Sequence, residues 1–155
     1  MISPELLRRY AFFRHLDDNL LKSIAMLADE VSYSRGETLF DADQPATALY
    51  LLAEGSVDLH YIVTDRDNPQ TRKDFYVGPV NPGEPFGISA LIEPYHYTAT
   101  AVADRPCHLI RIDAAGLRAL CAANAEVAAV LMRHTAEAAM ARLRETRVQL
   151  AASRL

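Results

Sequence analysis

The densest group of side chains that could bind a ligand is Tyr95-His96-Tyr97, in the second half of the chain. Two phenol rings can stack on a flat ligand, and an imidazole can donate or accept a hydrogen bond. Aromatic residues are also ordinary occupants of strands, and a lone histidine is often a surface residue. Both interpretations of this group stay open from the residues alone.

The chain shows no catalytic pattern and no metal site. It contains no GxSxG nucleophile elbow, no phosphate-binding P-loop and no HExxH motif. No two of its five histidines have metal-ligand spacing on one expected element. Its two cysteines, Cys107 and Cys121, form no CxxC pair, and we expect both to be reduced and packed as small apolar side chains. The sequence therefore predicts neither an enzyme nor a metalloprotein.

Length and composition predict one globular domain over residues 1–155. Half of the residues are hydrophobic and 23% are charged, which is ordinary for a folded protein. The net charge of -4 disfavours nucleic acid as a partner. The N-terminus lacks a secretory signal, and no apolar run approaches the length of a membrane span. We therefore expect a cytoplasmic protein without a membrane segment.

Helix signals lie at both ends of the chain, and strand signals lie between them. Ser3-Pro4-Glu5 and Asp17 are typical helix starts, so helices are expected within residues 4–29. From about residue 31 to 113, short runs of β-forming residues alternate with turns. These runs are Ala48–Ala53, Val57–Val63, Phe75–Val80, Thr98–Ala103 and Cys107–Ile112. This spacing favours a sandwich, jelly roll or barrel over a βαβ fold.

Two further helices are expected over about residues 114–152. Asp113 is the N-cap candidate of a short one, and Asn124 opens a long one that ends near Ala152. Small and apolar residues recur along the long helix at alternating four- and three-residue spacing: Met132, Ala136, Ala139, Leu143, Thr146 and Leu150. This is a coiled-coil-like seam. It predicts either contact with a second copy or packing on the chain's own β region.

Four segments, in this order, carry a family resemblance. They are Phe13-Arg14-His15-Leu16, the GETLF strand within Arg35–Phe40, the ALYLLAEGSV hairpin of Ala48–Val57, and the Pro82–Gly87 turn. Together they resemble the cyclic-nucleotide-binding domain family, which includes the sensor half of catabolite-activator-type (Crp/Fnr-type) transcription factors. The resemblance spans roughly Phe12 to Leu150. It implies an α+β fold: a β-roll, or jelly-roll-like double-stranded β-helix core, with N-terminal helices and a long C-terminal helix.

The resemblance also implies a ligand site, which in this family is a phosphate cassette reading approximately FGE-x-x-L before an arginine. Backbone N–H groups of the cassette bind the cyclic phosphate, the arginine pairs with its charge, and the glutamate accepts from the ribose hydroxyl. Here Ile88 stands at the glutamate position and Tyr97 at the arginine position. His96 is one residue away and in a strand would point to the opposite face, although it could replace part of the missing arginine.

The two replacements predict weak binding of cyclic AMP. A hydrogen bond to a charged group contributes about 1.5–3 kcal/mol. A buried charge without its partner costs roughly 3–5 kcal/mol. Each 1.4 kcal/mol or so is a factor of ten, so micromolar binding would become millimolar or weaker. The backbone donors of Gly87, Ser89 and Ala90 and the hydroxyl of Thr98 remain for a weaker anion or a neutral ligand.

The sequence thus predicts a regulatory sensor or binding module that is not an enzyme. Its pocket is expected between the cassette and the following strand, beneath the long helix. The candidate ligand-binding residues are Phe86, Gly87, Ile88, Ser89, Ala90, Leu91, His96, Tyr97, Thr98 and Ala99. No resident cofactor is required, and the ligand is either a cyclic nucleotide or another small molecule.

The alternative is a ligand-free domain for dimerisation or protein docking. A homodimer would use the seam residues Met132, Ala136, Ala139, Leu143 and Leu150. Direct DNA binding is disfavoured, because no recognition helix follows the long helix in this chain. The sequence leaves open the ligand, the partner, and whether a DNA-binding half belongs to a longer protein.

Overall fold

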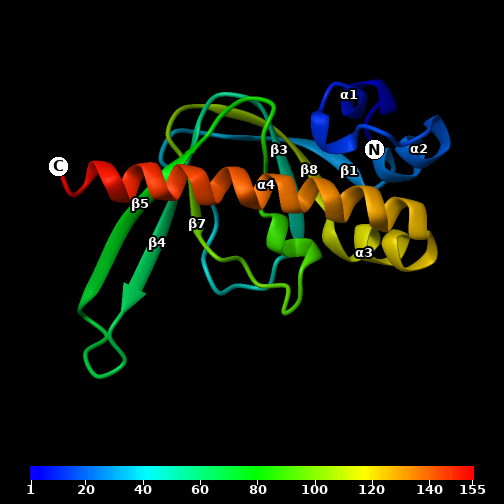
Figure 1. Ribbon diagram of the computed structural model, residues 1–155. Helices are drawn as coiled ribbons and strands as arrows, with labels where there is room; N and C mark the ends of the chain where they lie inside the picture. The colour runs from blue at the N-terminus through cyan, green and yellow to red at the C-terminus, as the bar shows by residue number, and fades with distance from the viewer.

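Two four-stranded antiparallel sheets lie at the centre of the molecule, with helices at one end and a long helix across them (Figure 1). The computed structural model describes all of residues 1–155. The strands are β1 (Ala28–Tyr33), β2 (Thr38–Phe40), β3 (Ala48–Glu54), β4 (Val57–Thr64), β5 (Arg72–Val80), β6 (Pro85–Phe86), β7 (Thr100–Ala103) and β8 (Cys107–Asp113). One sheet has the order β1-β8-β3-β6 and the other β2-β7-β4-β5. This arrangement confirms the predicted α+β fold with a β-roll core.

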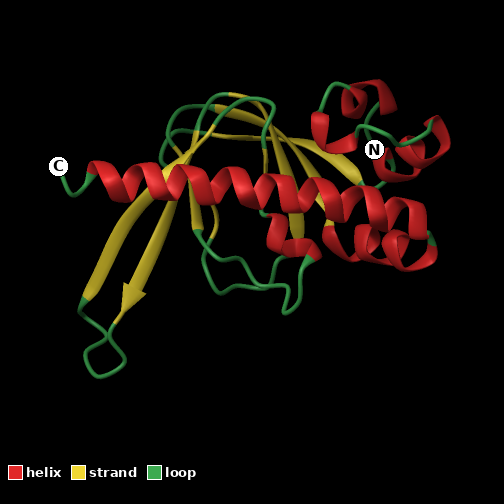
Figure 2. Ribbon diagram, viewed as in Figure 1, coloured by secondary structure: helices red, strands yellow, loops and turns green.

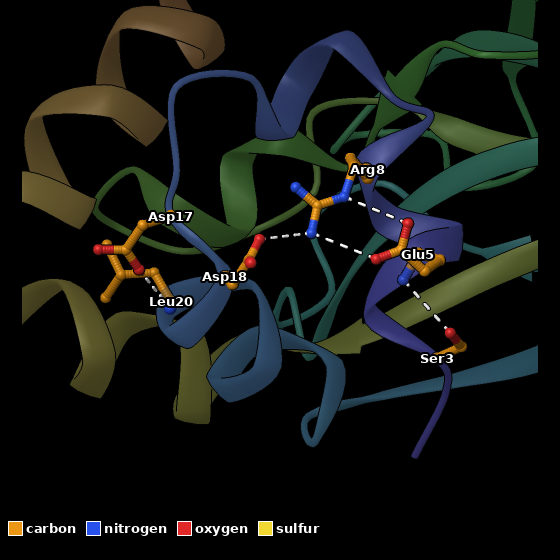
Figure 3. Close-up of polar contacts among 6 residues, drawn as sticks. All are labelled: Ser3, Glu5, Arg8, Asp17, Asp18 and Leu20. Atoms are coloured by element: carbon orange, nitrogen blue, oxygen red, sulfur yellow. Dashed lines mark hydrogen bonds and ion pairs between the residues drawn. The ribbon is translucent and has the colours of Figure 1, made fainter.

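The helical segments at the N-terminus are short, and the two α-helices among them begin at capped positions (Figure 3). Helix α1 covers Pro4–Arg8, the 3-10 turn η1 covers Ala11–Phe13, and α2 covers Asp18–Ala25. Ser3 Oγ accepts from the N–H of Glu5, and the carboxylate of Asp17 accepts from the N–H of Leu20. These bonds satisfy backbone donors that a helix start leaves free, as the sequence predicted. Arg8 joins the two helices by donating to Asp18 at 2.6 Å.

Strand β3 shows how the core is divided. Its side chains alternate between two faces, as the two-residue period of a strand requires. Leu49 and Leu51 are fully buried against the helices, while Tyr50 and Leu52 are buried between the sheets. Both faces of β3 are therefore covered, which explains its nearly continuous apolar sequence.

The two C-terminal helices follow directly from β8. Helix α3 (Ala114–Ala123) begins where Asp113 accepts from the N–H of Gly116, and α4 (Ala125–Ala152) begins where Asn124 accepts from the N–H of Val127. Val127 and Leu131 in the first turns of α4 are fully buried. From this anchored end, α4 runs across the β region toward β5 (Figures 1 and 2). None of the helices has an apolar stretch long enough to cross a bilayer.

Two strands differ from the sequence-based expectation. The strand expected from Phe75 begins earlier, at Arg72, because it pairs with β4 as far as Thr64. The resulting β4–β5 hairpin projects away from the rest of the molecule (Figure 1). The strand expected from Thr98 begins only at Thr100, since Thr98 and Ala99 pair with no neighbouring strand.

Candidate functional site

A cavity of about 680 Å³ lies between the β region and α4, at the place where the sequence predicted a pocket. Its walls come from the cassette turn, the base of the β4–β5 hairpin and one side of α4. Size and composition are those of a small-molecule site. The residues that line it are Phe40, Leu59, Tyr61, Val77, Pro85, Phe86, Gly87, Ile88, Ser89, Ile92, Tyr97, Thr98, Ala99, Met132, Thr135, Ala136, Ala139, Arg142 and Thr146.

The cassette is a single 3-10 turn, η2 (Ile88–Leu91), that begins at Gly87. Gly87 has φ of 67°, in the left-handed region, and a Cβ there would lie 3.2 Å from Cε1 of Tyr97. Glycine therefore permits both the turn and the close approach of the Tyr97 ring. The N–H of Ala90 donates to the carbonyl of Gly87 at 3.1 Å. This corrects the expectation that Ala90 offers a free donor to an anion.

Tyr97 is part of the scaffold. Its side chain is 3% exposed, and its ring stacks on Phe40 with centroids 3.7 Å apart. Its hydroxyl donates to the carbonyl of Ala48 at 2.7 Å and accepts from the N–H of Ala48 at 3.1 Å. Burial raises the pKa of Tyr97, so the phenol stays neutral. The Tyr97 hydroxyl therefore carries no charge and is hydrogen-bonded to β3.

Arg142 is the one charged residue in the cavity wall, and it already has partners. Its guanidinium donates to the carbonyl of Pro79 at 2.6 Å and to Oε2 of Glu84 at 3.3 Å. These bonds tie α4 to the end of β5 and to the turn before the cassette. Arg142 was not among the predicted site residues, because its partners lie about sixty residues earlier and no local pattern joins them.

Seven of the ten candidate site residues line the cavity: Phe86, Gly87, Ile88, Ser89, Tyr97, Thr98 and Ala99. Ala90 and Leu91 instead lie in the core beneath it. His96 is exposed, lies in an isolated bridge with Pro45, and does not line the cavity. Of the ten candidate residues, His96 is thus the one that lies at the surface outside the cavity wall.

The predicted helix seam is divided between two surroundings. Met132, Ala136, Ala139 and Thr146 line the cavity, together with Thr135, which was not among the predicted residues. Leu143 and Leu150 are 43% and 56% exposed. One face of α4 thus forms the cavity wall near its middle and an uncovered apolar surface toward its end.

No group of three or more histidine, cysteine or acidic side chains is close enough to hold a metal ion. Both cysteines are free, Cys107 in a buried position and Cys121 in a half-buried one. Burial raises the pKa of both thiols, which keeps them protonated and poorly reactive. Neither cysteine lines the cavity.

Comparisons with known proteins agree with this geometry. The family model described as the cyclic nucleotide-binding domain matches residues 30–124. A crystal structure of a candidate cyclic nucleotide-binding protein from Geobacter metallireducens GS-15 aligns with a TM-score of 0.80 and 41% identity, over 92% of this chain and 99% of that chain.

Two curated relatives are larger proteins. A CRP-like cAMP-activated global transcriptional regulator of Mycobacterium tuberculosis is 25% identical over 95% of this chain, and the match covers 61% of the regulator. A candidate potassium channel protein of Rhodopseudomonas palustris is 29% identical over 83% of this chain and 29% of the channel protein. The chain therefore spans less than two thirds of either relative. From the family match and the shared fold, the chain belongs to the cyclic nucleotide-binding domain family.

Proposed function

We propose that this domain is a regulatory sensor whose cavity does not bind cyclic AMP in the family's usual way. The proposal rests on Tyr97, which stands at the arginine position. Its hydroxyl is hydrogen-bonded to both the N–H and the carbonyl of Ala48. Ile88 adds an apolar side chain at the glutamate position. A phosphate seated here would meet no unpaired cation, and burying an unpaired charge is costly.

Helix α4 is the element that would report ligand binding. It contributes six residues to the cavity wall, at the positions Met132, Thr135, Ala136, Ala139, Arg142 and Thr146. A ligand that fits one position of α4 better than another shifts the population toward that position. The curated relatives support a regulatory role, since a matching segment occurs within a transcriptional regulator and within a channel protein.

Thermal unfolding tests the loss of conventional binding. A ligand present at 100 times its dissociation constant adds about 2.7 kcal/mol to the stability of the folded state. For a domain of this size, that shift in stability raises the melting temperature by roughly 5–10 °C. We expect millimolar cyclic AMP or cyclic GMP to shift the melting temperature by no more than inorganic phosphate does at the same ionic strength. A rise of several degrees at micromolar cyclic AMP would contradict the proposal.

A second candidate function, as a homodimerisation domain, is favoured by the uncovered end of α4. Met140, Leu143, Val148 and Leu150 are all more than 40% exposed, and two of them, Leu143 and Leu150, lie on the predicted seam. The seam residues Leu143 and Leu150 continue the line of Met132, Ala136 and Ala139 along the helix. A second copy that docks on this line would also cover the rim of the cavity, which would link ligand binding to assembly.

Sedimentation measurements test the dimer. We expect the protein to sediment as a dimer and the Leu143→Arg variant as a monomer, because a buried guanidinium without a partner destabilises an interface. Ala141→Arg is the matched control, since Ala141 is also exposed on α4 but lies two residues from Leu143, on the opposite side of the helix from the seam. A monomeric wild-type protein at high micromolar concentration would refute this function.

A further inference from the structure

A row of arginines runs along the outward side of α4. Arg133, Arg144 and Arg147 are all exposed, and they are here termed the arginine face. An α-helix turns about 100° per residue, so these three residues fall within an arc of about 60° and extend over about 20 Å of the helix axis. The buried side chains of α4 lie roughly on the opposite side of the helix: Val127, Leu131, His134 and Thr135.

The charges of the arginine face have no partner within the chain. No ion pair of the protein involves Arg133, Arg144 or Arg147. Between Arg133 and Arg147, the carboxylate nearest this row belongs to Glu137, and that carboxylate contacts His134. The arginine face therefore keeps a net positive charge that only an anionic group from outside the chain can neutralise.

An apolar side chain lies in the middle of the same face. Met140 falls at the centre of the arc and is 65% exposed, and Val148 beside it is 58% exposed. Methionine and arginine are both enriched in protein–protein interfaces relative to the rest of protein surfaces. A complementary partner therefore needs acidic groups on either side of an apolar row.

This combination favours one class of anionic partner over two others. A nucleic acid or an anionic bilayer extends beyond α4 and would meet the net charge of the chain, which is -4. A phosphate backbone also has no apolar surface for Met140, and helices that lie on bilayers usually insert aromatic or large aliphatic side chains. A single acidic helix contacts only the arginine face, and charges more than about 10 Å away are screened at physiological salt.

We propose that the arginine face of α4 docks an acidic amphipathic helix of a partner protein. Carboxylates of the partner pair with the guanidinium groups, and an apolar row between those carboxylates covers Met140. This inference goes beyond the sensor proposal and does not depend on what the cavity binds. Because another side of α4 lines the cavity, the partner would contact the same helix that a ligand contacts.

Fluorescence anisotropy with a labelled peptide tests the docking surface. The probe is a helical peptide with three copies of the repeat Glu-Leu-Glu-Ala-Ala-Leu-Ala, in which glutamates flank a row of leucines. We expect saturable binding at low salt and at least tenfold weaker binding in 0.5 M NaCl, because salt screens exposed charges. The double variant Arg144→Glu/Arg147→Glu should weaken binding at least tenfold, and Met140→Ala should weaken it about threefold. The matched control, Arg35→Glu/Arg66→Glu, makes the same charge change at exposed positions outside α4 and should change the affinity less than threefold.

Three outcomes would overturn the inference. Absence of saturation at millimolar peptide and low salt would show that the arginine face does not dock an acidic helix. Equal weakening by the two double variants would show that binding follows the net charge of the protein and not this face. Tighter binding of a DNA duplex, or of phosphatidylglycerol vesicles, than of the peptide at the same salt would replace the acidic helix with a polyanion.

Discussion

Removal of one oxygen atom, in the Tyr97→Phe variant, tests whether Tyr97 is a structural anchor. The ring remains stacked on Phe40, so only the two hydrogen bonds to Ala48 are lost. The N–H and carbonyl of Ala48 then lie in a buried region without these partners, because Ala48 is 4% exposed. A buried polar group that loses its partner costs about 1–3 kcal/mol. We expect a loss of about 2 kcal/mol, equivalent to a melting temperature lower by roughly 4–8 °C.

Urea unfolding of the variant and a matched control measures this loss. Tyr95→Phe is the control, since Tyr95 is half-buried, its hydroxyl makes no hydrogen bond within the chain, and its ring contact with Arg118 does not need the hydroxyl. We expect the control to remain within about 0.5 kcal/mol of wild type, as surface substitutions usually do. If Tyr97→Phe is equally neutral, the phenol is not an anchor, and the main support for the altered ligand site is lost.

Three further predictions concern the cassette, helix α4 and alkaline pH. Gly87→Ala should lower the free energy of unfolding, measured in urea, by about 1–2 kcal/mol. The left-handed backbone at this position disfavours a Cβ, and the added Cβ would lie 3.2 Å from the ring of Tyr97. An unchanged urea midpoint would contradict this. Arg142→Met should lower the free energy of unfolding by about 1.5–3 kcal/mol, because the hydrogen bonds to Pro79 and Glu84 are lost. Hydrogen exchange of the backbone amides in the second half of α4 should also become faster. Unchanged exchange rates would show that these bonds do not hold the helix. Burial raises the pKa of Tyr50 and Tyr97, so above about pH 10 the unfolded chain loses these protons first and stability should fall as pH rises; urea midpoints that stay level from pH 9 to 11 would refute this.

Local features of the fold were predictable because they depend on neighbours in the chain. Ser3, Asp17, Asp113 and Asn124 each cap a helix by accepting from an N–H two or three residues later. The run of β-forming residues Val57–Val63 between two turns indicated a strand, and β4 covers Val57–Thr64. The position of the cassette, by contrast, was implied by the family resemblance, through the Pro82–Gly87 turn that precedes it.

The lining of the cavity was only partly predictable. The cassette and Tyr97 were assigned from the resemblance to the family's ligand motif. The hairpin residues Leu59 and Val77 read simply as strand residues, because nothing local shows which face a curved sheet presents to a cavity. The direction of the Tyr97 hydroxyl was also hidden, since its partner Ala48 lies 49 residues earlier.

By itself, the sequence determined the succession of helices, short strands and a long final helix, together with the side-chain types at the cassette. Tertiary structure alone decided what the helix seam faces. A repeat of alternating three and four residues selects one side of a helix without specifying its partner, so Met132, Ala136 and Ala139 fit a second chain as well as a cavity wall. The docking of α4 across the β region placed them in the wall and left Thr135 beside them without a hydrogen-bond partner. Such contacts join segments far apart in the chain, and their geometry exists only once the sheets and helices have packed.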